Sequence, residues 1–169
     1  MKQQLIIFIT AILAGCVSIP DNVTPVTEFE TEKYMGTWYE IARLDHWFER
    51  DLDQVTANYK LQDNGTVQVI NRGFDGNKQE WKEAVGKAKF VDDINTGYLK
   101  VSFFGPFYGA YVVFELGENY DYAFVAGNDT DYLWFLSRTP EVSEAMQQHF
   151  ISKASELGFP TDELIFVQH

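Results

Sequence analysis

The most specific indication of the fold is Gly36-Thr37-Trp38-Tyr39, together with Leu136-Ser137-Arg138 near the other end of the chain. A glycine lets the backbone approach closely where a chain enters a barrel, and an inward tryptophan can close one end with a large flat ring. An arginine can then lie on the indole face and donate hydrogen bonds to carbonyl groups left bare there. Alone, Gly-x-Trp also fits an ordinary buried tryptophan near a turn, so the rest of the chain must decide.

The N-terminus has the features of an export signal. Lys2 is the only charged side chain of this segment, and the apolar run over residues 5–13 is too short to span a bilayer. Leu13-Ala14-Gly15-Cys16 resembles the bacterial lipoprotein box, in which cleavage leaves the cysteine as the first residue, carrying a diglyceride and an N-linked acyl group such as palmitate. The alternative is an ordinary signal followed by an incidental thiol. We predict that residues 1–15 are removed and that Cys16 is lipidated.

Composition predicts one acidic domain without disulfides. The formal net charge is −12, and it becomes −13 (12 basic and 25 acidic residues) when Lys2 is removed with the signal. Such a surface repels nucleic acid and anionic membranes, so we expect the lipid alone to attach the protein to a membrane. In the lipoprotein family an acidic residue after the cysteine signals inner-membrane retention, and Val17 stands there instead. We therefore expect a lipid-anchored protein of the bacterial outer membrane, facing the periplasm.

Residues 16–30 are expected to be a lipidated tether, and residues 31–169 the folded domain. Within the domain, short segments of period-2 hydrophobicity alternate with turn sequences such as Asn64-Gly65 and Asp75-Gly76-Asn77. The predicted strands cover 36–45, 54–62, 66–73, 80–91, 98–104, 109–116, 121–127 and 131–138. Eight strands are enough to close an up-and-down antiparallel barrel.

After Arg138 the hydrophobic period changes to that of a helix. Thr139 is the expected cap and Pro140 the first helical residue, and Gly158-Phe159-Pro160 ends the helix. Its apolar stripe is expected to cover the outer wall of the barrel and not to bind a partner: Val142, Met146, Phe150, Ala154 and Leu157. Residues 164–167 are predicted to add a short strand.

This order of elements resembles the lipocalin family over nearly the whole mature chain. The resemblance implies an all-β fold, an eight-stranded up-and-down antiparallel β-barrel with one C-terminal α-helix packed outside and a short added strand. The middle family motif is approximately present as Tyr120-Asp121-Tyr122, although the family usually has threonine where Tyr120 stands. The lipid anchor and the lack of disulfides make the chain similar to bacterial outer-membrane lipoprotein lipocalins.

Trp38 sets the register of the inner wall. If it points inward, Glu40 and Ala42 do too, while Ile41 and Arg43 point outward. The residues predicted to line the pocket wall and mouth are Val55, Ala57, Val67, Val69, Asn71, Lys82, Ala84, Gly86, Leu99, Val101, Phe103, Tyr111, Val113, Tyr132 and Trp134. Small members such as Ala57, Ala84 and Gly86 favour a cavity over a solid core, the alternative for a barrel of this size.

Strand direction separates a closed end from an open one. Gly36, Trp38 and Arg138 are expected at the closed end, where they serve the fold. The open end collects the loop over 45–53, which resembles the lid loop of the family, and the aromatic segment over 103–108. Exposed aromatic rings at the mouth would suit an apolar ligand. The alternative is that these rings pack on one another and make the loop rigid.

These features predict a lipid carrier. Each buried CH₂ contributes roughly 0.8 kcal/mol, so a long tail can offset its immobilisation. The expected ligand is a fatty acid or lysophospholipid in envelope storage, transport or repair, with Lys82 or Arg50 near its head group. The strongly negative charge disfavours a free fatty acid relative to a zwitterionic lysophospholipid.

Two other classes remain open. An enzyme on this scaffold would rely on His46, although a loop histidine is usually polar surface. A structural lipoprotein with a filled barrel is the second. We expect no catalytic residues, cofactor or metal site and no nucleic-acid partner, and a homodimer is among the states that the sequence allows.

Overall fold

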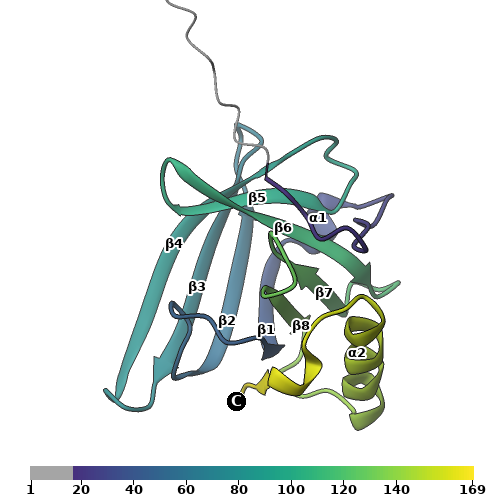
Figure 1. Ribbon diagram of the computed structural model, residues 1–169. Helices are drawn as coiled ribbons and strands as arrows, with labels where there is room; N and C mark the ends of the chain where they lie inside the picture. The colour runs from purple at the N-terminus through teal and green to yellow at the C-terminus, as the bar shows by residue number, and fades with distance from the viewer. Residues whose placement is uncertain (1–16) are drawn as a thin grey trace, which may run out of the picture.

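The computed structural model describes residues 17–169, so the predicted signal and Cys16 lie outside the described residues (Figure 1). The helical elements are α1 (Thr31–Tyr34), α2 (Glu144–Glu156) and the 3₁₀ turn η1 (Thr161–Glu163). The strands are β1 (Gly36–Arg43), β2 (Leu52–Leu61), β3 (Val67–Asp75), β4 (Glu80–Phe90), β5 (Tyr98–Phe104), β6 (Phe107–Leu116), β7 (Tyr122–Ala126), β8 (Leu133–Ser137) and β9 (Ile165–Phe166). No helix within 17–169 is both long and apolar enough to cross a membrane.

The sheet confirms the predicted barrel. Its strand order is β2-β3-β4-β5-β6-β7-β8-β1-β9, every pairing is antiparallel, and β1 also pairs with β2. The closing pairs join the first half of β1 to the end of β2, for example Trp38 opposite Ala57. The second half of β1 pairs instead with β9, outside the eight-stranded ring, which is the predicted added strand.

Two apolar clusters lie on opposite faces of the barrel wall. The inner cluster surrounds Trp38 and includes Val69, Leu99 and Val125. The outer cluster joins α2 to the wall, and Phe150 of the helix stands 4.8 Å from Phe124 of β7 between ring centroids. In Figure 1, α2 lies alongside β7 and β8. The helix therefore packs on the outer wall, as its apolar stripe predicts.

The start of α2 differs from the prediction. Ser143, and not Thr139, is the N-cap, and its hydroxyl accepts a hydrogen bond from the backbone N–H of Met146 at 3.2 Å. The Thr139 hydroxyl instead donates to the carbonyl of Glu141 at 2.8 Å. Thr-Pro is a good start signal, but the serine four residues after Thr139 forms the cap that the first turn uses.

The predicted register of β1 is wrong after Glu40. The pairing of β1 with β8 shifts between Glu40 and Ala42, which places an extra residue in one strand. Ala42 consequently joins the outer cluster with Ile41, while Arg43 is buried and bonds the inward Glu40. A bulge reverses the alternation beyond it, so a period-2 pattern alone could not place Arg43 inside.

The segment expected to be a tether lies against the barrel. The Tyr98 hydroxyl donates to the carbonyl of Val17 at 2.6 Å, and Val17 and Ile19 pack against the outer cluster. Further along, the N–H of Val26 donates to the carbonyl of Val113 at 2.9 Å, and Phe29 is buried. Its prolines and polar residues suggested a free chain, but its scattered apolar side chains are enough to hold it on the wall.

Candidate functional site

The closed end is formed by Trp38 and Arg138. The guanidinium carbon of Arg138 lies 3.8 Å from the centroid of the fully buried indole. The guanidinium donates to the carbonyls of Lys33, Met35 and Thr37 at 2.7 to 2.9 Å. Gly36 has a φ of +95°, which favours glycine, and a Cβ there would lie 3.5 Å from the guanidinium. The motif residues thus join β1, α1 and β8 at the end opposite the mouth.

Tyr120 makes the turn before β7 differ from the usual family motif. It adopts a positive φ of 56°, its carbonyl accepts a hydrogen bond from Nε of Arg138 at 3.2 Å, and its hydroxyl accepts one from the N–H of Glu30 at 2.8 Å. A side chain longer than the usual threonine therefore reaches the segment before α1. The departure from the family motif adds a contact to the closed end.

Three tyrosine hydroxyls lie above this floor. The Tyr111 hydroxyl is 2.7 Å from that of Tyr34 and 2.9 Å from that of Tyr59. Burial raises the pKa of all three phenols above the ordinary range, so they are neutral in the folded protein. Their mutual bonds satisfy the hydroxyl groups inside an otherwise apolar space.

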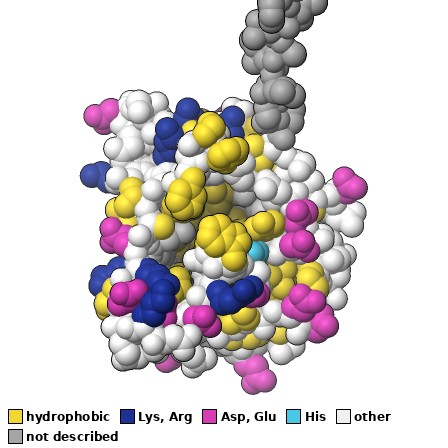
Figure 2. All heavy atoms as spheres, turned by 60° about the vertical axis from the view of Figure 1, so that its left-hand side comes forward, with side chains coloured by type: hydrophobic (Ala, Val, Ile, Leu, Met, Phe, Trp, Pro, Cys, Tyr) yellow, Lys and Arg dark blue, Asp and Glu magenta, His cyan; other side chains and the backbone are white. Residues whose placement is uncertain are grey.

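The predicted pocket residues differ in their exposure to solvent. Val55, Ala57, Val67, Val69, Leu99 and Val113 are buried, whereas Asn71, Lys82, Gly86, Val101, Phe103, Tyr111, Tyr132 and Trp134 are partly exposed. Ala84 is exposed although its strand partner, Asn71, shares a face with the buried Val69. Solvent therefore reaches the inner wall of β3 and β4. Figure 2 shows this face hollowed, with hydrophobic side chains around the hollow.

The small residues of the wall do not all leave space. A Cβ at Gly86 would lie 2.7 Å from the ring of Phe103, so that ring already fills the volume beside the glycine. Ala57 is buried in the inner cluster with Trp38. Of these three small residues, only Ala84 is exposed, and it is therefore the one that indicates open volume on the inner wall.

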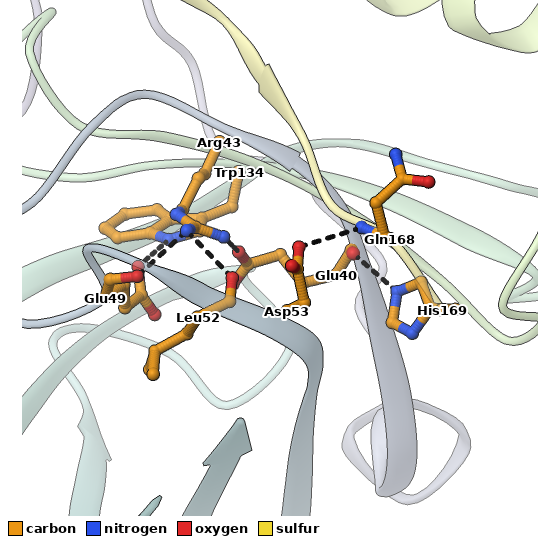
Figure 3. Close-up of polar contacts among 8 residues, drawn as sticks. All are labelled: Glu40, Arg43, Glu49, Leu52, Asp53, Trp134, Gln168 and His169. Atoms are coloured by element: carbon orange, nitrogen blue, oxygen red, sulfur yellow. Dashed lines mark hydrogen bonds and ion pairs between the residues drawn. The ribbon is translucent and has the colours of Figure 1, made fainter. Parts of the chain in front are cut away.

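A buried group of charges lies inside the barrel and was not predicted (Figure 3). Arg43 donates from Nη1 to Oε1 of Glu40 at 2.7 Å and from Nη2 to the carbonyls of Glu49 and Leu52 at 2.9 and 3.1 Å. The indole N–H of Trp134 donates to Oε2 of Glu49 at 3.0 Å. Arg43 thereby ties both ends of the segment 49–52 to β1. The sequence did contain an indication of this buried group, because Glu40 and Arg43 are charged residues in β1, whose other residues are mostly apolar.

The two carboxyls of this group compete for one arginine. Burial, and next the charge of Glu49, raise the pKa of Glu40 to about 8, against the opposing effect of Arg43. Burial also raises the pKa of Glu49, although Trp134 and Arg43 oppose the shift. Burial therefore favours a protonated carboxyl in this group, because the interior stabilises a second negative charge poorly.

The lid loop folds over the mouth with its aromatic residues divided between interior and solvent. His46 is buried and stacks on Tyr132 and Phe48, with ring centroids 4.6 and 5.2 Å away. Burial lowers its pKa, so the imidazole is neutral. Trp47 is 75% exposed. The expectation that His46 is polar surface is therefore wrong, because it is packed between Phe48 of its own loop and Tyr132, which precedes β8.

Both cations expected near a head group are paired with carboxylates of the chain. Lys82 lies 2.5 Å from Asp75, and Arg50 lies 2.5 Å from Asp45. Lys82 lowers the pKa of Asp75, and Arg50 lowers that of Asp45. A cleft of about 500 Å³ opens here, lined by Arg43, Asp45, Arg50, Asp51, Leu52, Asp53, Gly76, Asn77 and Ile165. These two cations of the mouth are thus already compensated by carboxylates.

Within residues 17–169, no three histidine, cysteine, aspartate or glutamate side chains are grouped so that they could hold a metal ion. His149, on α2, pairs with Glu115 of β6 on the outer wall. His169 binds the carbonyl of Glu40 at 2.9 Å beside the β9 end of the barrel. Neither of these histidines contributes to the mouth.

Comparisons with known proteins identify the family. The family model described as a lipocalin-like domain matches residues 29–169. The chain is 55% identical over 169 residues to the outer membrane lipoprotein Blc of Vibrio cholerae, covering 99% of both chains. It is 48% identical over 149 residues to the Blc of Escherichia coli K12, covering 88% of this chain and 84% of that one.

Among solved structures, insecticyanin from Manduca sexta superposes with a TM-score of 0.70 at 20% identity, over 90% of this chain and 87% of that chain. This similarity concerns the fold alone. The sequence relatives are close and span nearly the whole chain, and they are outer membrane lipoproteins by name. The chain therefore belongs to the lipocalin family, as an outer membrane lipoprotein.

Proposed function

We propose that this lipocalin carries or stores a single-tailed lipid, a fatty acid or a lysophospholipid, in maintenance of the bacterial envelope. The observation that carries the proposal is the solvent-accessible inner wall at Ala84, next to an apolar lining that ends at Trp38. An eight-stranded barrel can hold one small ligand and no more. The tail would enter from the mouth and lie along this wall, and the acyl groups on Cys16 would hold the protein at the periplasmic face of the outer membrane.

The mouth favours a zwitterionic head group. Because Lys82 and Arg50 are already paired with Asp75 and Asp45, neither offers an uncompensated positive charge to a carboxylate. A head group with both signs of charge can exchange partners with such pairs at little electrostatic cost. We therefore rank a lysophospholipid above a free fatty acid.

A substitution at Ala84 tests where the tail lies. Ala84→Trp should fill the hollow and lower the affinity of the delipidated, refolded protein for lysophospholipid by at least about tenfold, since about two buried CH₂ groups account for that much. The matched control is Val85→Trp, which adds the same side chain at an exposed position on the outer face of β4. Equal affinity in both folded variants would place the tail elsewhere.

Mass spectrometry of the extracted protein tests whether the barrel is a carrier at all. A carrier should retain lipid whose tail length is restricted, because affinity grows with each buried CH₂ until the barrel is full. If the wild-type protein retains no lipid and binds none after delipidation, the barrel is a structural element and the proposal fails.

An enzyme remains the second candidate because of His46, a buried neutral imidazole whose Nε2 has no hydrogen-bond partner among the described residues. A neutral histidine at a lipid-sized mouth can act as a base. Turnover of a lysophospholipid that is abolished in His46→Ala would favour this class. Binding without turnover in both proteins would exclude His46 as a catalytic residue.

A further inference from the structure

The first described residue is fixed to one face of the barrel. Tyr98, at the start of β5, bonds the carbonyl of Val17 at 2.6 Å, and Ile19 packs against the outer cluster. The proposed acylated residue, Cys16, directly precedes Val17. If Cys16 carries the acyl chains, the barrel is therefore held at the bilayer with almost no free linker, and the wall near Tyr98 lies next to the membrane.

Beside this point lies a group of lysines. Lys100 follows Tyr98 by two residues and so shares its outward face, and its partner across the ladder is Lys89. Both ammonium groups lie over the ring of Tyr108, at 5.5 and 6.0 Å from its centroid. Lys87 is exposed on the same face of β4. Within residues 17–169 none of these three lysines forms an ion pair, unlike Lys82 and Arg50.

Two exposed rings adjoin the lysines at the tip of the β5–β6 hairpin. Phe104 and Phe107 are partners across the hairpin and are 72% and 78% exposed. Figure 2 shows basic side chains beside hydrophobic ones along the upper edge of that view. Because β5 runs away from the closed end, its last residue, Phe104, lies toward the open end of the barrel.

We propose that this basic face, defined by Lys87, Lys89, Lys100, Tyr108, Phe104 and Phe107, docks on an anionic phospholipid surface. Lysines attract a negatively charged leaflet over short distances, and aromatic rings partition into the interface. The net charge of −13 does not prevent this, because salt screens charges beyond about 8 Å at physiological ionic strength. On this proposal the lipid anchor is not the protein's only attachment to the membrane, in contrast to the expectation from its net charge.

Docking orients the barrel as well as adding affinity. The anchor fixes one point near Tyr98, and the hairpin tip supplies a second contact toward the mouth. The open end would then lie at the bilayer surface, where a single-tailed lipid can pass between membrane and barrel without crossing water. The docking does not require that lipid be carried, so the two proposals can fail separately.

The test uses the full lipidated protein in vesicles of phosphatidylethanolamine with phosphatidylglycerol. Cys16 is the only natural cysteine, so a polarity-sensitive fluorophore on Phe107→Cys reports a single position, and Glu156→Cys on α2 serves as the distant probe. We expect lipids carrying a quencher in their tails to quench the probe at 107 and not the probe at 156. Equal quenching at both positions would overturn the proposal.

Charge reversal then tests the lysines. Lys87→Glu, Lys89→Glu and Lys100→Glu together should release the probe at 107 while the anchor keeps the protein on the vesicle. For three lysines the equilibrium constant for docking should fall on the order of a hundredfold. The control reverses Lys60, Lys78 and Lys153, an equal change of net charge elsewhere. If both triple variants behave alike, or if residue 107 cross-links to a second copy instead of meeting lipid, the face is not a membrane-docking surface.

Discussion

Arg138 joins three segments of the closed end through its guanidinium, which stacks on Trp38 and donates to carbonyl groups on α1, β1 and the turn before β7. Methionine keeps much of the side-chain length but has no donors. Arg138→Met should therefore lower the free energy of unfolding by about 2–4 kcal/mol, from a lost cation–π contact and several unpaired carbonyls. Urea denaturation measures this directly.

A second arginine provides the control for that substitution. Arg72 stacks over Trp81 at 4.2 Å on the outer wall, and within residues 17–169 its guanidinium donates no hydrogen bond to a carbonyl. Arg72→Met should cost less than about 1 kcal/mol, the range for an exposed cation–π pair. If both substitutions cost the same, the carbonyl contacts of Arg138 contribute nothing and the indole contact alone explains its role.

Glu40 should make the stability of the barrel depend on pH. Its pKa rises from the ordinary 4.5 to about 8 on folding, so between these values the native state binds a proton that the unfolded chain has lost. The stabilisation is therefore complete below pH 4.5 and is lost as the pH rises toward 8. Glu40→Gln should flatten this part of the stability profile, measured as the urea midpoint against pH.

Glu83→Gln is the control for the pH experiment, because Glu83 is exposed on β4 and carries the same charge. It should leave the slope between pH 4.5 and 8 as in the wild type. An unchanged slope in Glu40→Gln would mean that Glu40 is ionised throughout, with Arg43 outweighing its burial.

At the scale of elements, two substitutions distinguish which residue, Ser143 or Thr139, caps the N-terminus of α2. Ser143→Ala removes the acceptor for the Met146 N–H and should cost about 1 kcal/mol. Thr139→Ala removes only a donor to the Glu141 carbonyl in an exposed turn and should cost clearly less. Thermal unfolding of both variants measures the difference, and a larger loss at Thr139 would contradict the assignment of Ser143.

The elements that the sequence predicts best are those whose hydrophobic period is unbroken. β5 begins at Tyr98 and ends at Phe104, as predicted, and the stripe around Phe150 lies against the wall. β1 is different, because its bulge moves Arg43 inward after Glu40. The short helix before Gly36 was also not predicted, since a single turn has no period to detect.

At the scale of the whole molecule, local patterns could predict the inner wall but not the contacts between distant segments. The wall positions follow from alternation along each strand. The pairing of Glu49 with Trp134, and the burial of His46 against Tyr132, depend on how the lid loop folds back over the mouth. The path of Val17 along β5 likewise depends on a wall that the local sequence does not contain.

The distribution of charge over the whole molecule yields the last prediction. If local pairing at the mouth sets ligand preference, Asp45→Asn should free Arg50 and raise the affinity for a fatty acid up to about fivefold, the range for one exposed ion pair. Binding of a lysophospholipid should change less, because its head group is neutral overall. Fluorescence titration of the two lipids gives both affinities.

Glu156→Gln changes the net charge by the same amount at an exposed position on α2, outside the cleft. If the overall negative charge controls access of anionic lipids, this variant should gain as much fatty-acid affinity as Asp45→Asn. If Arg50 acts locally, only Asp45→Asn should gain, and the advantage should persist in high salt because a contact pair at the mouth is screened less than the long-range field of the protein.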